Sequence, residues 1–203
     1  YIVLGPISGS TSLSSADAKL LGDATSAGLG SSTSYLGDQD GDGYDDFAVG
    51  ATQDDTIGSD AGAVFVLSGS SSPDALGGSS VSSVASAIIY GPSRGHQLGT
   101  SVSGIGDFDG DAVNDLLIGA PNGGSPASGF TYLFSGPVTG VLATTEAMAS
   151  FSGENTSDAA GSPVNFVGDI GGLGTDAIGI SALASDRSGT DAGTLYFLFE
   201  VGP

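Results

Sequence analysis

Short apolar runs alternate with clusters of glycine, serine and aspartate along the whole chain. Each run has the length of a strand and is bounded by turn-forming residues, a pattern that predicts an all-β protein. Six of the runs are residues 46–51, 62–69, 87–91, 115–120, 129–136 and 193–200. Several runs are apolar at successive rather than alternate positions, so we expect both faces of these strands to be buried.

Three sets of residues recur along the chain at the same two intervals, 69 and 62 residues. The first set contains the glycines that end an apolar run, Gly22, Gly91 and Gly153. The second contains the glycines eight residues later, Gly30, Gly99 and Gly161. The third contains the aspartates a further eight residues on, Asp38, Asp107 and Asp169. Three sets that recur at the same intervals predict a structural repeat of 60 to 70 residues.

Each repeat unit holds about four strands, and four-stranded units of this length predict the blades of a β-propeller. We expect one domain over residues 1–203, with two complete antiparallel blades at 31–91 and 100–153. Residues 1–22 match the third and fourth strands of a blade, and residues 162–200 match the first three. The propeller is therefore incomplete, and we expect further sequence or strands of neighbouring chains to complete it. The second alternative makes the protein a homo-oligomer or a polymer.

The loop between the first and second strands of each complete unit carries aspartates at positions 1, 3, 5 and 9. These residues are Asp38, Asp40, Asp42 and Asp46 in the first loop, and Asp107, Asp109, Asp111 and Asp115 in the second. Side chains at alternate positions of a tight loop converge, and the backbone carbonyl at position 7, that of Tyr44 or Val113, can join them. Hard oxygen ligands in a flexible loop are what Ca²⁺ prefers. The sequence therefore predicts two calcium sites, in which the cation offsets the repulsion between the carboxylates.

The two loops differ from an EF-hand, which needs Glu at position 12, because that position is Val49 or Ile118. A solvated acidic turn is the alternative for either loop alone, but two matched loops in register with the strand repeat disfavour it. The loops also differ from one another, since Ala112 stands where glycine is usual at position 6 of the second. A left-handed backbone there would cost about 1 kcal/mol.

The third loop begins at Asp169 but carries Gly171, Leu173 and Ala177 at positions 3, 5 and 9. Asp176 is shifted by one position from the place that a ligand needs. We therefore expect no calcium in this loop and little effect from replacing Asp176.

Acidic residues dominate the charge of the chain, with 23 Asp and Glu against three Lys and Arg and a formal net charge of −20. Such a surface repels the phosphates of nucleic acids and of anionic membranes, which argues against both as partners. No apolar run approaches the roughly 20 residues that a membrane helix needs, so we expect no membrane insertion. The chain has no cysteine, which excludes disulfides and zinc–thiolate sites.

The segments LGDQDGDGYDDFAVGA (36–51) and IGDFDGDAVNDLLIGAP (105–121) resemble FG-GAP repeats, the blades of the integrin α-subunit β-propeller and of many bacterial extracellular proteins. The Gly-Ala-Pro element stands at 119–121 and is Gly-Ala-Thr at 50–52. The Phe-Gly element is degenerate, as Leu29-Gly30, Leu98-Gly99 and Ala160-Gly161. The resemblance implies a calcium-stabilised propeller, extracellular or at the cell surface, that serves adhesion or assembly.

Three classes of function remain open from the sequence. The first is a calcium-stabilised structural or adhesive repeat protein that self-assembles into a filament or oligomer by strand addition. The second is a receptor-like propeller that binds a surface glycan or a protein ligand. The third is a non-catalytic part of a larger secreted enzyme. We expect no catalysis from this chain, because calcium accounts for the clustered carboxylates and no nucleophile–base pair stands out.

Four other residues carry weaker indications. His96 is the only histidine, and its place just before a strand predicts a loop or packing role. We expect Arg94 and Arg187 to pair with acidic residues of the surface rather than to bind a ligand. Asn155-Thr156-Ser157 fits an N-glycosylation sequon, so Asn155 is a candidate glycan site.

Overall fold

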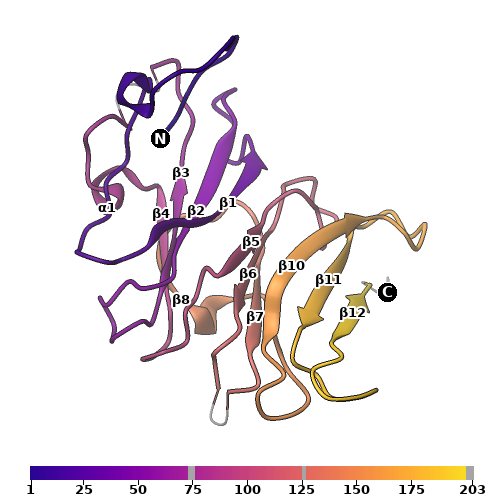
Figure 1. Cartoon of the computed structure of the whole chain (residues 1–203). Coiled ribbons are helices and arrows are strands. Elements are labelled where there is room, and N and C mark those ends of the chain that lie inside the picture. The colour runs from indigo at the N-terminus through magenta and orange to yellow at the C-terminus, as the bar shows by residue number, and fades with distance from the viewer. Residues whose placement is uncertain (73–75, 125–126, 200–203) are drawn as a thin grey trace.

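Three stacked β-sheets form the protein in a computed structural model that describes residues 1–72, 76–124 and 127–199 (Figure 1). We call them the first, second and third blades. In order across its sheet, the first blade contains β1 (Leu29–Gly37), β2 (Asp46–Ala51), β3 (Ala63–Leu67), β4 (Ala87–Tyr90) and β8 (Gly140–Ala143). The second contains β5 (Ser101–Ser103), β6 (Leu116–Ala120), β7 (Phe130–Phe134) and β9 (Ala149–Ser152). The third contains β10 (Ala160–Gly168), β11 (Ala177–Ala182) and β12 (Thr194–Leu198).

Helical structure in the described residues is short. It consists of the 3₁₀ turns η1 (Leu13–Ser15) and η3 (Thr144–Glu146) and the single-turn helix α1 (Val81–Val84). None of the described helices has the length and apolar character that crossing a membrane requires. The prediction of an all-β fold built from stacked propeller-type blades, incomplete as a ring, is therefore confirmed.

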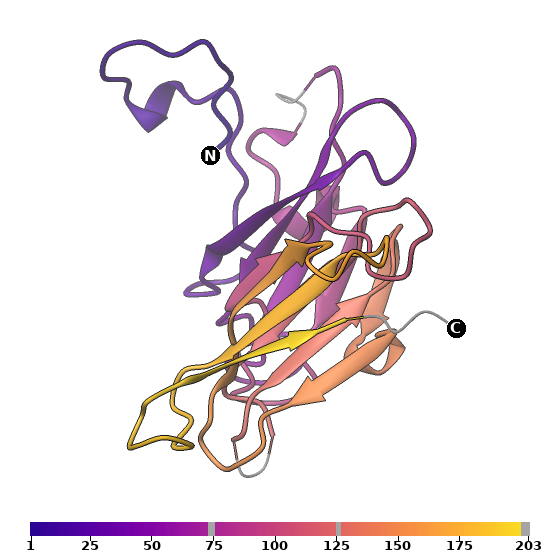
Figure 2. The same ribbon diagram turned by 90° about the vertical axis from the view of Figure 1, so that its right-hand side faces the viewer.

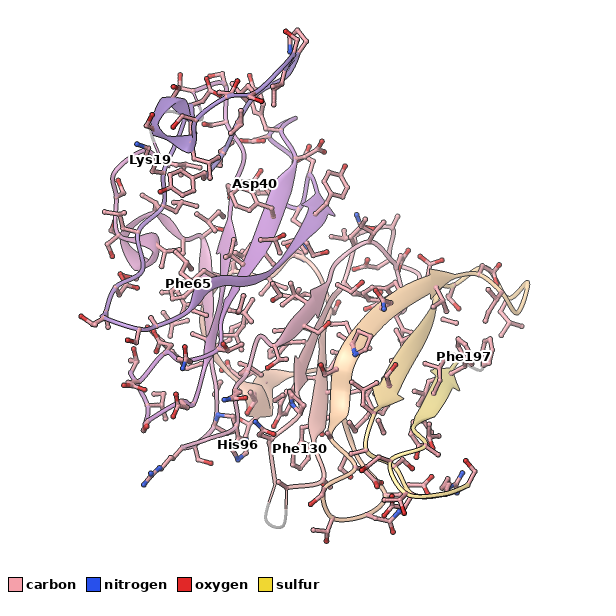
Figure 3. The ribbon with its side chains drawn as sticks, in the orientation of Figure 1. Lys19, Asp40, Phe65, His96, Phe130 and Phe197 are labelled. Carbon is pink, nitrogen blue, oxygen red and sulfur yellow. The ribbon has the colours of Figure 1, made fainter. Side chains whose placement is uncertain are left out.

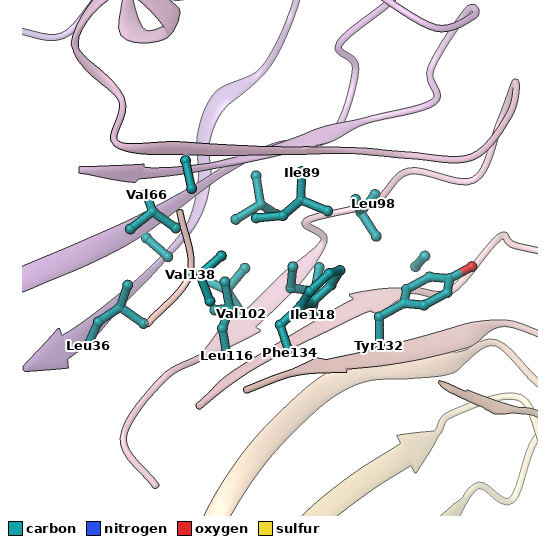
Figure 4. Close-up of a cluster of buried hydrophobic side chains, with 14 residues drawn as sticks. Leu36, Val66, Ile89, Leu98, Val102, Leu116, Ile118, Tyr132, Phe134 and Val138 are labelled. Atoms are coloured by element: carbon teal, nitrogen blue, oxygen red, sulfur yellow. The ribbon is translucent and has the colours of Figure 1, made fainter. Parts of the chain in front are cut away.

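Each middle strand is buried on both faces, as its continuous apolar sequence predicts. In β6, Leu116 and Ile118 join a cluster between the first and second blades, whereas Leu117 joins a cluster between the second and third. Figure 4 shows the first of these clusters, in which Val66 and Ile89 of the first blade face Leu116 and Ile118 across the gap between the sheets. Burial of each such side chain contributes about 1.5–3 kcal/mol, so blade stacking supplies most of the core.

Glycines of the repeat motif let neighbouring blades approach closely. A Cβ atom on Gly119 of β6 would overlap the carbonyl oxygen of Gly161 in the third blade. A Cβ atom on Gly50 of β2 would overlap that of Gly99, which leads into the second blade. The glycine of the Gly-Ala-Pro element therefore packs on the glycine of the degenerate Phe-Gly element one unit later, which explains why both recur at fixed spacing.

Strand β8 is a feature that the sequence analysis did not predict. It lies between the third and fourth strands of the second blade in sequence, yet it pairs with β4 of the first blade, from Ala87↔Gly140 to Tyr90↔Ala143. The pairing is parallel, unlike the other strand pairs within the described sheets. The second repeat unit thus supplies a strand that covers the outer edge of the first blade, an edge that would otherwise be open.

Residues 1–22 do not form the two strands that their sequence predicts. One isolated antiparallel bridge joins Ile2 and Ala18, and η1 lies between them. Figure 2 shows this segment projecting from the first blade. A two-stranded ribbon is marginally stable by itself, and the described sheets offer it no antiparallel neighbour. Leu21 instead makes a single parallel bridge to Ser80.

The two ends of the stack differ in how well they are covered. On the outward face of the first blade, Phe65 and Leu67 are almost fully buried, in a cluster that includes Val81 of α1 (Figure 3 labels Phe65). On the outward face of the third blade, Leu195 and Phe197 remain 54% and 49% exposed. The third blade has three strands, as expected for residues 162–200, and the last residue of that range lies outside the described residues.

Candidate metal centres in the acidic loops

The first acidic loop, residues 38–46, joins β1 to β2 and is organised by its position-1 aspartate. One oxygen of Asp38 accepts the backbone N–H groups of Gly41 (2.8 Å) and Asp42 (3.0 Å), and the other accepts that of Gly43 (2.9 Å). The tight turn that results brings one carboxylate oxygen from each of Asp38, Asp40 and Asp42 within 4.8 Å of the others. Three of the four predicted carboxylate ligands therefore converge in this loop.

The second acidic loop, residues 107–115, joins β5 to β6 and repeats this geometry. Asp107 accepts the N–H groups of Gly110 (2.6 Å), Asp111 (3.1 Å) and Ala112 (2.8 Å). Here the three carboxylates within 4.8 Å of one another are those of Asp107, Asp109 and Asp115. Asp111 lies outside this cluster and accepts the N–H of Val113 at 2.8 Å.

The aspartate at position 9 has a structural role in both loops. The two oxygens of Asp46 accept the N–H groups of Gln39 and Gly69, each at 2.9 Å, and this buried residue lies outside the cluster of its loop. Asp115 makes the equivalent bonds to Phe108 (2.8 Å) and Gly136 (3.1 Å). Position 9 thus ties each loop to the end of the third strand of its own blade.

Burial shifts the ionisation of these anchors. It raises the pKa of Asp115 to about 6, against the backbone N–H donors, and the carboxylates of Asp109 and Asp107 add to the rise. Burial also raises the pKa of Asp46, and the charges of Asp40 and Asp42 act in the same direction. Crowded carboxylates of like charge disfavour ionisation, so a bound cation would favour the ionised form at both positions.

The donor set fits a hard divalent cation. Each cluster offers carboxylate oxygens without nitrogen or sulfur donors. The first cluster is exposed, so water can fill remaining positions there, whereas the second includes the buried Asp115. Calcium accepts six to eight such oxygens in flexible geometry. Asp38, Asp40 and Asp42 would hold one ion, and Asp107, Asp109 and Asp115 a second. The backbone carbonyls of Tyr44 and Val113, and the carboxylates of Asp46 and Asp111, remain predicted ligands.

The third loop keeps the turn and lacks the other carboxylates. Asp169 accepts the N–H groups of Leu173 (2.8 Å) and Gly174 (2.9 Å), and these bonds lower its pKa. Positions 3, 5 and 9 hold residues without carboxylates, so the expectation that this loop takes no calcium stays a prediction.

Asp176 has a larger role than the sequence analysis expected. Its carboxylate accepts the N–H of Asp107 at 3.1 Å, and its own N–H donates to the carbonyl of Asp107 at 2.9 Å. It therefore fixes position 1 of the second loop from the neighbouring blade. These bonds argue against the expectation that replacing Asp176 has little effect, because they give the residue a role other than that of a ligand.

Two further residues, Gln39 and Asn114, join the first two loops and were missed. The Gln39 amide donates to the carbonyl of Asn114 at 2.7 Å, and the Asn114 amide donates to the carbonyl of Leu36 at 2.8 Å. Asn114 and Asp176 both occupy position 8 of their loops, and both reach back to the preceding blade. The polar residue at position 8 was the one sequence signal that could have identified this contact.

The remaining candidates lie away from the acidic loops. Figure 3 places His96 near the opposite ends of the strands from Asp40, beside Phe130, and the rings of His96 and Phe130 are stacked at a centroid distance of 6.5 Å. The packing role predicted for His96 is therefore confirmed, and burial lowers its pKa. Arg187 forms an ion pair with Glu154 at 2.9 Å, as predicted. Asn155 lies on an exposed loop, and its glycosylation stays a prediction.

Comparison with known proteins identifies the repeat. The FG-GAP repeat family matches residues 31–67 and 98–134, which include both acidic loops. Integrin alpha-5 of Xenopus laevis is 33% identical over 110 residues, which are 51% of this chain and 10% of that protein. Integrin alpha-PS5 of Drosophila melanogaster is 37% identical over 104 residues, 48% of this chain and 9% of that protein. The chain thus spans about a tenth of these relatives. Two segments of the chain therefore match the FG-GAP repeat, and about half of the chain is similar to these integrin α-subunits.

Proposed function

We propose that this chain is a calcium-stabilised module of an extracellular or cell-surface adhesive protein. The observation that carries the proposal is the convergence of carboxylates in both acidic loops, at positions 1, 3 and 5 of the first loop and positions 1, 3 and 9 of the second. In each loop three carboxylates come within 4.8 Å of one another, at the same place in two FG-GAP repeats. Each cation would replace mutual repulsion by attraction and would hold the loop that connects the first two strands of a blade.

The kind of ligand follows from the resemblance to integrin α-subunits, which favours a protein partner. A surface glycan is the alternative partner. The strongly acidic surface supports exclusion of nucleic acids and anionic lipids. The chain itself contributes binding and structure rather than catalysis in this proposal.

Thermal unfolding with calcium and with chelator tests the calcium sites. The variant of choice is Asp42→Asn, which removes a cluster carboxylate but keeps an oxygen that can accept the N–H of Tyr44. We expect this variant to melt at a lower temperature than the wild type in calcium, and at the same or a higher temperature in chelator because it removes one charge from the cluster. Asp191→Asn, at an exposed position outside the loops, serves as the matched control. Equal shifts with and without calcium would contradict the assignment.

Self-assembly by strand addition is a second proposed function, favoured by the open third blade. Strand β12 pairs with β11 on one side only in the described sheets, and Phe197 is 49% exposed on the outward face. A fourth strand from a neighbouring chain would pair with β12 and give an oligomer, or a filament if the contacts repeat.

Sedimentation velocity over a range of concentrations tests this assembly. The wild type is expected to associate, and Phe197→Glu to remain monomeric because it places a charge on the contact face. Ile57→Glu, at a similarly exposed apolar residue of the first blade, is the control and should associate like the wild type. A wild type that stays monomeric at all concentrations would rule out strand addition between copies.

A further inference from the structure

A pair of amide side chains connects the two acidic loops directly. The Gln39 side chain donates to the backbone carbonyl of Asn114 at 2.7 Å and accepts the N–H of Val138 at 3.2 Å. In return the Asn114 side chain donates to the carbonyl of Leu36 at 2.8 Å, two residues before the first loop. Both loops are thus tied by hydrogen bonds that run in both directions between the first and second blades.

The connection meets each loop next to its carboxylates. Gln39 stands between Asp38 and Asp40, and its own backbone N–H donates to Asp46 at 2.9 Å. Asn114 directly precedes Asp115. A shift of either amide would therefore move the backbone that carries cluster residues in its loop.

The contact is also built for close fit. Gln39 is only 8% exposed, so water cannot readily replace the bonds that its amide makes. Gly37 has a φ of +73°, and a Cβ atom there would lie 2.7 Å from the Asn114 amide nitrogen. Only glycine at this position leaves room for the Asn114 side chain while adopting that conformation without strain.

We infer that Gln39 and Asn114 are positioning residues that couple the two loops, so that a divalent cation in one loop raises the affinity of the other. The first cation fixes the backbone of its loop, and the amide pair transmits that order to the second loop, which then has less conformational freedom to lose. The inference rests on the proposed calcium sites. By linkage the effect is reciprocal, whichever loop is filled first.

Terbium titration measures the coupling, because Tb³⁺ binds hard oxygen sites and Tyr44 lies within the first loop to sensitise its luminescence. The second loop has Val113 at the corresponding place, so this signal reports mainly the first. Asp109→Asn disables the second loop. We expect this change to raise the dissociation constant of the first loop about fivefold or more, the usual range of coupling between sites.

Two variants break the connection in different ways. Gln39→Met keeps the size of the side chain without its hydrogen bonds, and Asn114→Ala removes the reciprocal bond. In either background, adding Asp109→Asn should leave the affinity of the first loop unchanged. Gln53→Met, at an exposed glutamine away from the loops, is the control and should preserve the coupling. Circular dichroism of each variant confirms that the sheets are intact.

A second readout follows the protein backbone rather than the bound ion. In the Asp109→Asn protein, filling the first loop should slow hydrogen exchange at the amides of the second loop. In the protein that carries both Asp109→Asn and Gln39→Met, filling the first loop should leave that exchange unchanged. Two loops that bind with independent affinities in the wild type, or coupling that survives both Gln39→Met and Asn114→Ala, would overturn the inference while leaving the calcium sites standing. Absence of any binding would overturn the sites and the inference together.

Discussion

Loop position 6 shows how one residue type distinguishes two otherwise matched loops. Gly43 has a φ of +91° and Ala112 a φ of +71°, so both have a left-handed backbone. Ala112 therefore adopts the conformation that alanine disfavours. We expect Ala112→Gly to raise the free energy of unfolding by about 1 kcal/mol and Gly43→Ala to lower it by a similar amount. Urea denaturation in chelator measures both, and a less stable Ala112→Gly protein would contradict the account.

Asp176 illustrates a residue that acts on a neighbouring loop. Removing its carboxylate leaves the N–H of Asp107 without an acceptor, so we expect Asp176→Ala to lower the free energy of unfolding by about 1 kcal/mol. It should also weaken calcium binding in the second loop more than in the first. Asp176→Asn keeps an acceptor oxygen and should recover most of both effects. Calorimetric titration distinguishes this outcome from an Asp176→Ala protein that behaves like the wild type.

His96 gives the stability a dependence on pH. Burial lowers its pKa below the ordinary value of 6.5, so the unfolded chain binds a proton more readily than the folded protein. The contribution of neutral His96 is therefore present above about pH 6.5 and is lost as the pH falls below it. We expect the wild type to lose free energy of unfolding relative to His96→Phe as the pH falls from about 7.5 to 5.5. A difference that is constant over this range would contradict the assignment.

At the scale of elements, the close contact between a middle strand and the next blade limits which residues can replace the glycines of that strand. Gly119 of β6 touches the Gly161 backbone, so Gly119→Ala forces the second and third blades apart and should cost at least about 1–3 kcal/mol. Gly179 lies in β11, the middle strand of the third blade, and a Cβ atom there would meet nothing closer than 3.4 Å. Gly179→Ala is therefore expected to be tolerated in the monomer. Equal losses for the two variants, measured by urea denaturation, would contradict this packing account.

The strands of the blades could be predicted because their signal is local. β6 and β7 are continuous apolar runs between turn residues, and the fixed spacing of the glycines identifies the unit. β8 could not be predicted, because its pairing with β4 is a contact between two repeat units and its own sequence, Gly140–Ala143, is short. The strands expected within residues 1–22 do not form, because a strand-like sequence also needs a neighbouring strand to pair with.

The acidic loops show the same division. Spacing alone identified the residues that bring carboxylates together, including Asp38 and Asp107 at position 1. Spacing did not show that Asp46 would serve as a buried anchor, or that Asp111 would lie outside its cluster, because these outcomes depend on where backbone N–H donors lie in the folded blade. The Gln39–Asn114 contact depends on the stacking of two blades, and the sequence signals it only through the polar residue at loop position 8.

At the scale of the whole molecule, charge and cation binding are linked. A formal net charge of −20 disfavours a compact state through self-repulsion, and each bound calcium would offset part of it. A ligand that binds only the folded protein stabilises it by about 2.7 kcal/mol when present at a hundred times its dissociation constant. Two filled loops would therefore change the stability of the stack substantially, and calcium in the surroundings would set how firmly the blades are held.

The number of calcium ions bound per chain is the most direct measure of the central claim. Isothermal titration calorimetry of the chelator-treated protein should give two ions per chain, and Asp109→Asn should leave one, in the first loop. A wild-type protein that binds no calcium, or that binds the same number of ions with and without Asp109→Asn, would contradict the assignment of the two acidic loops as cation sites.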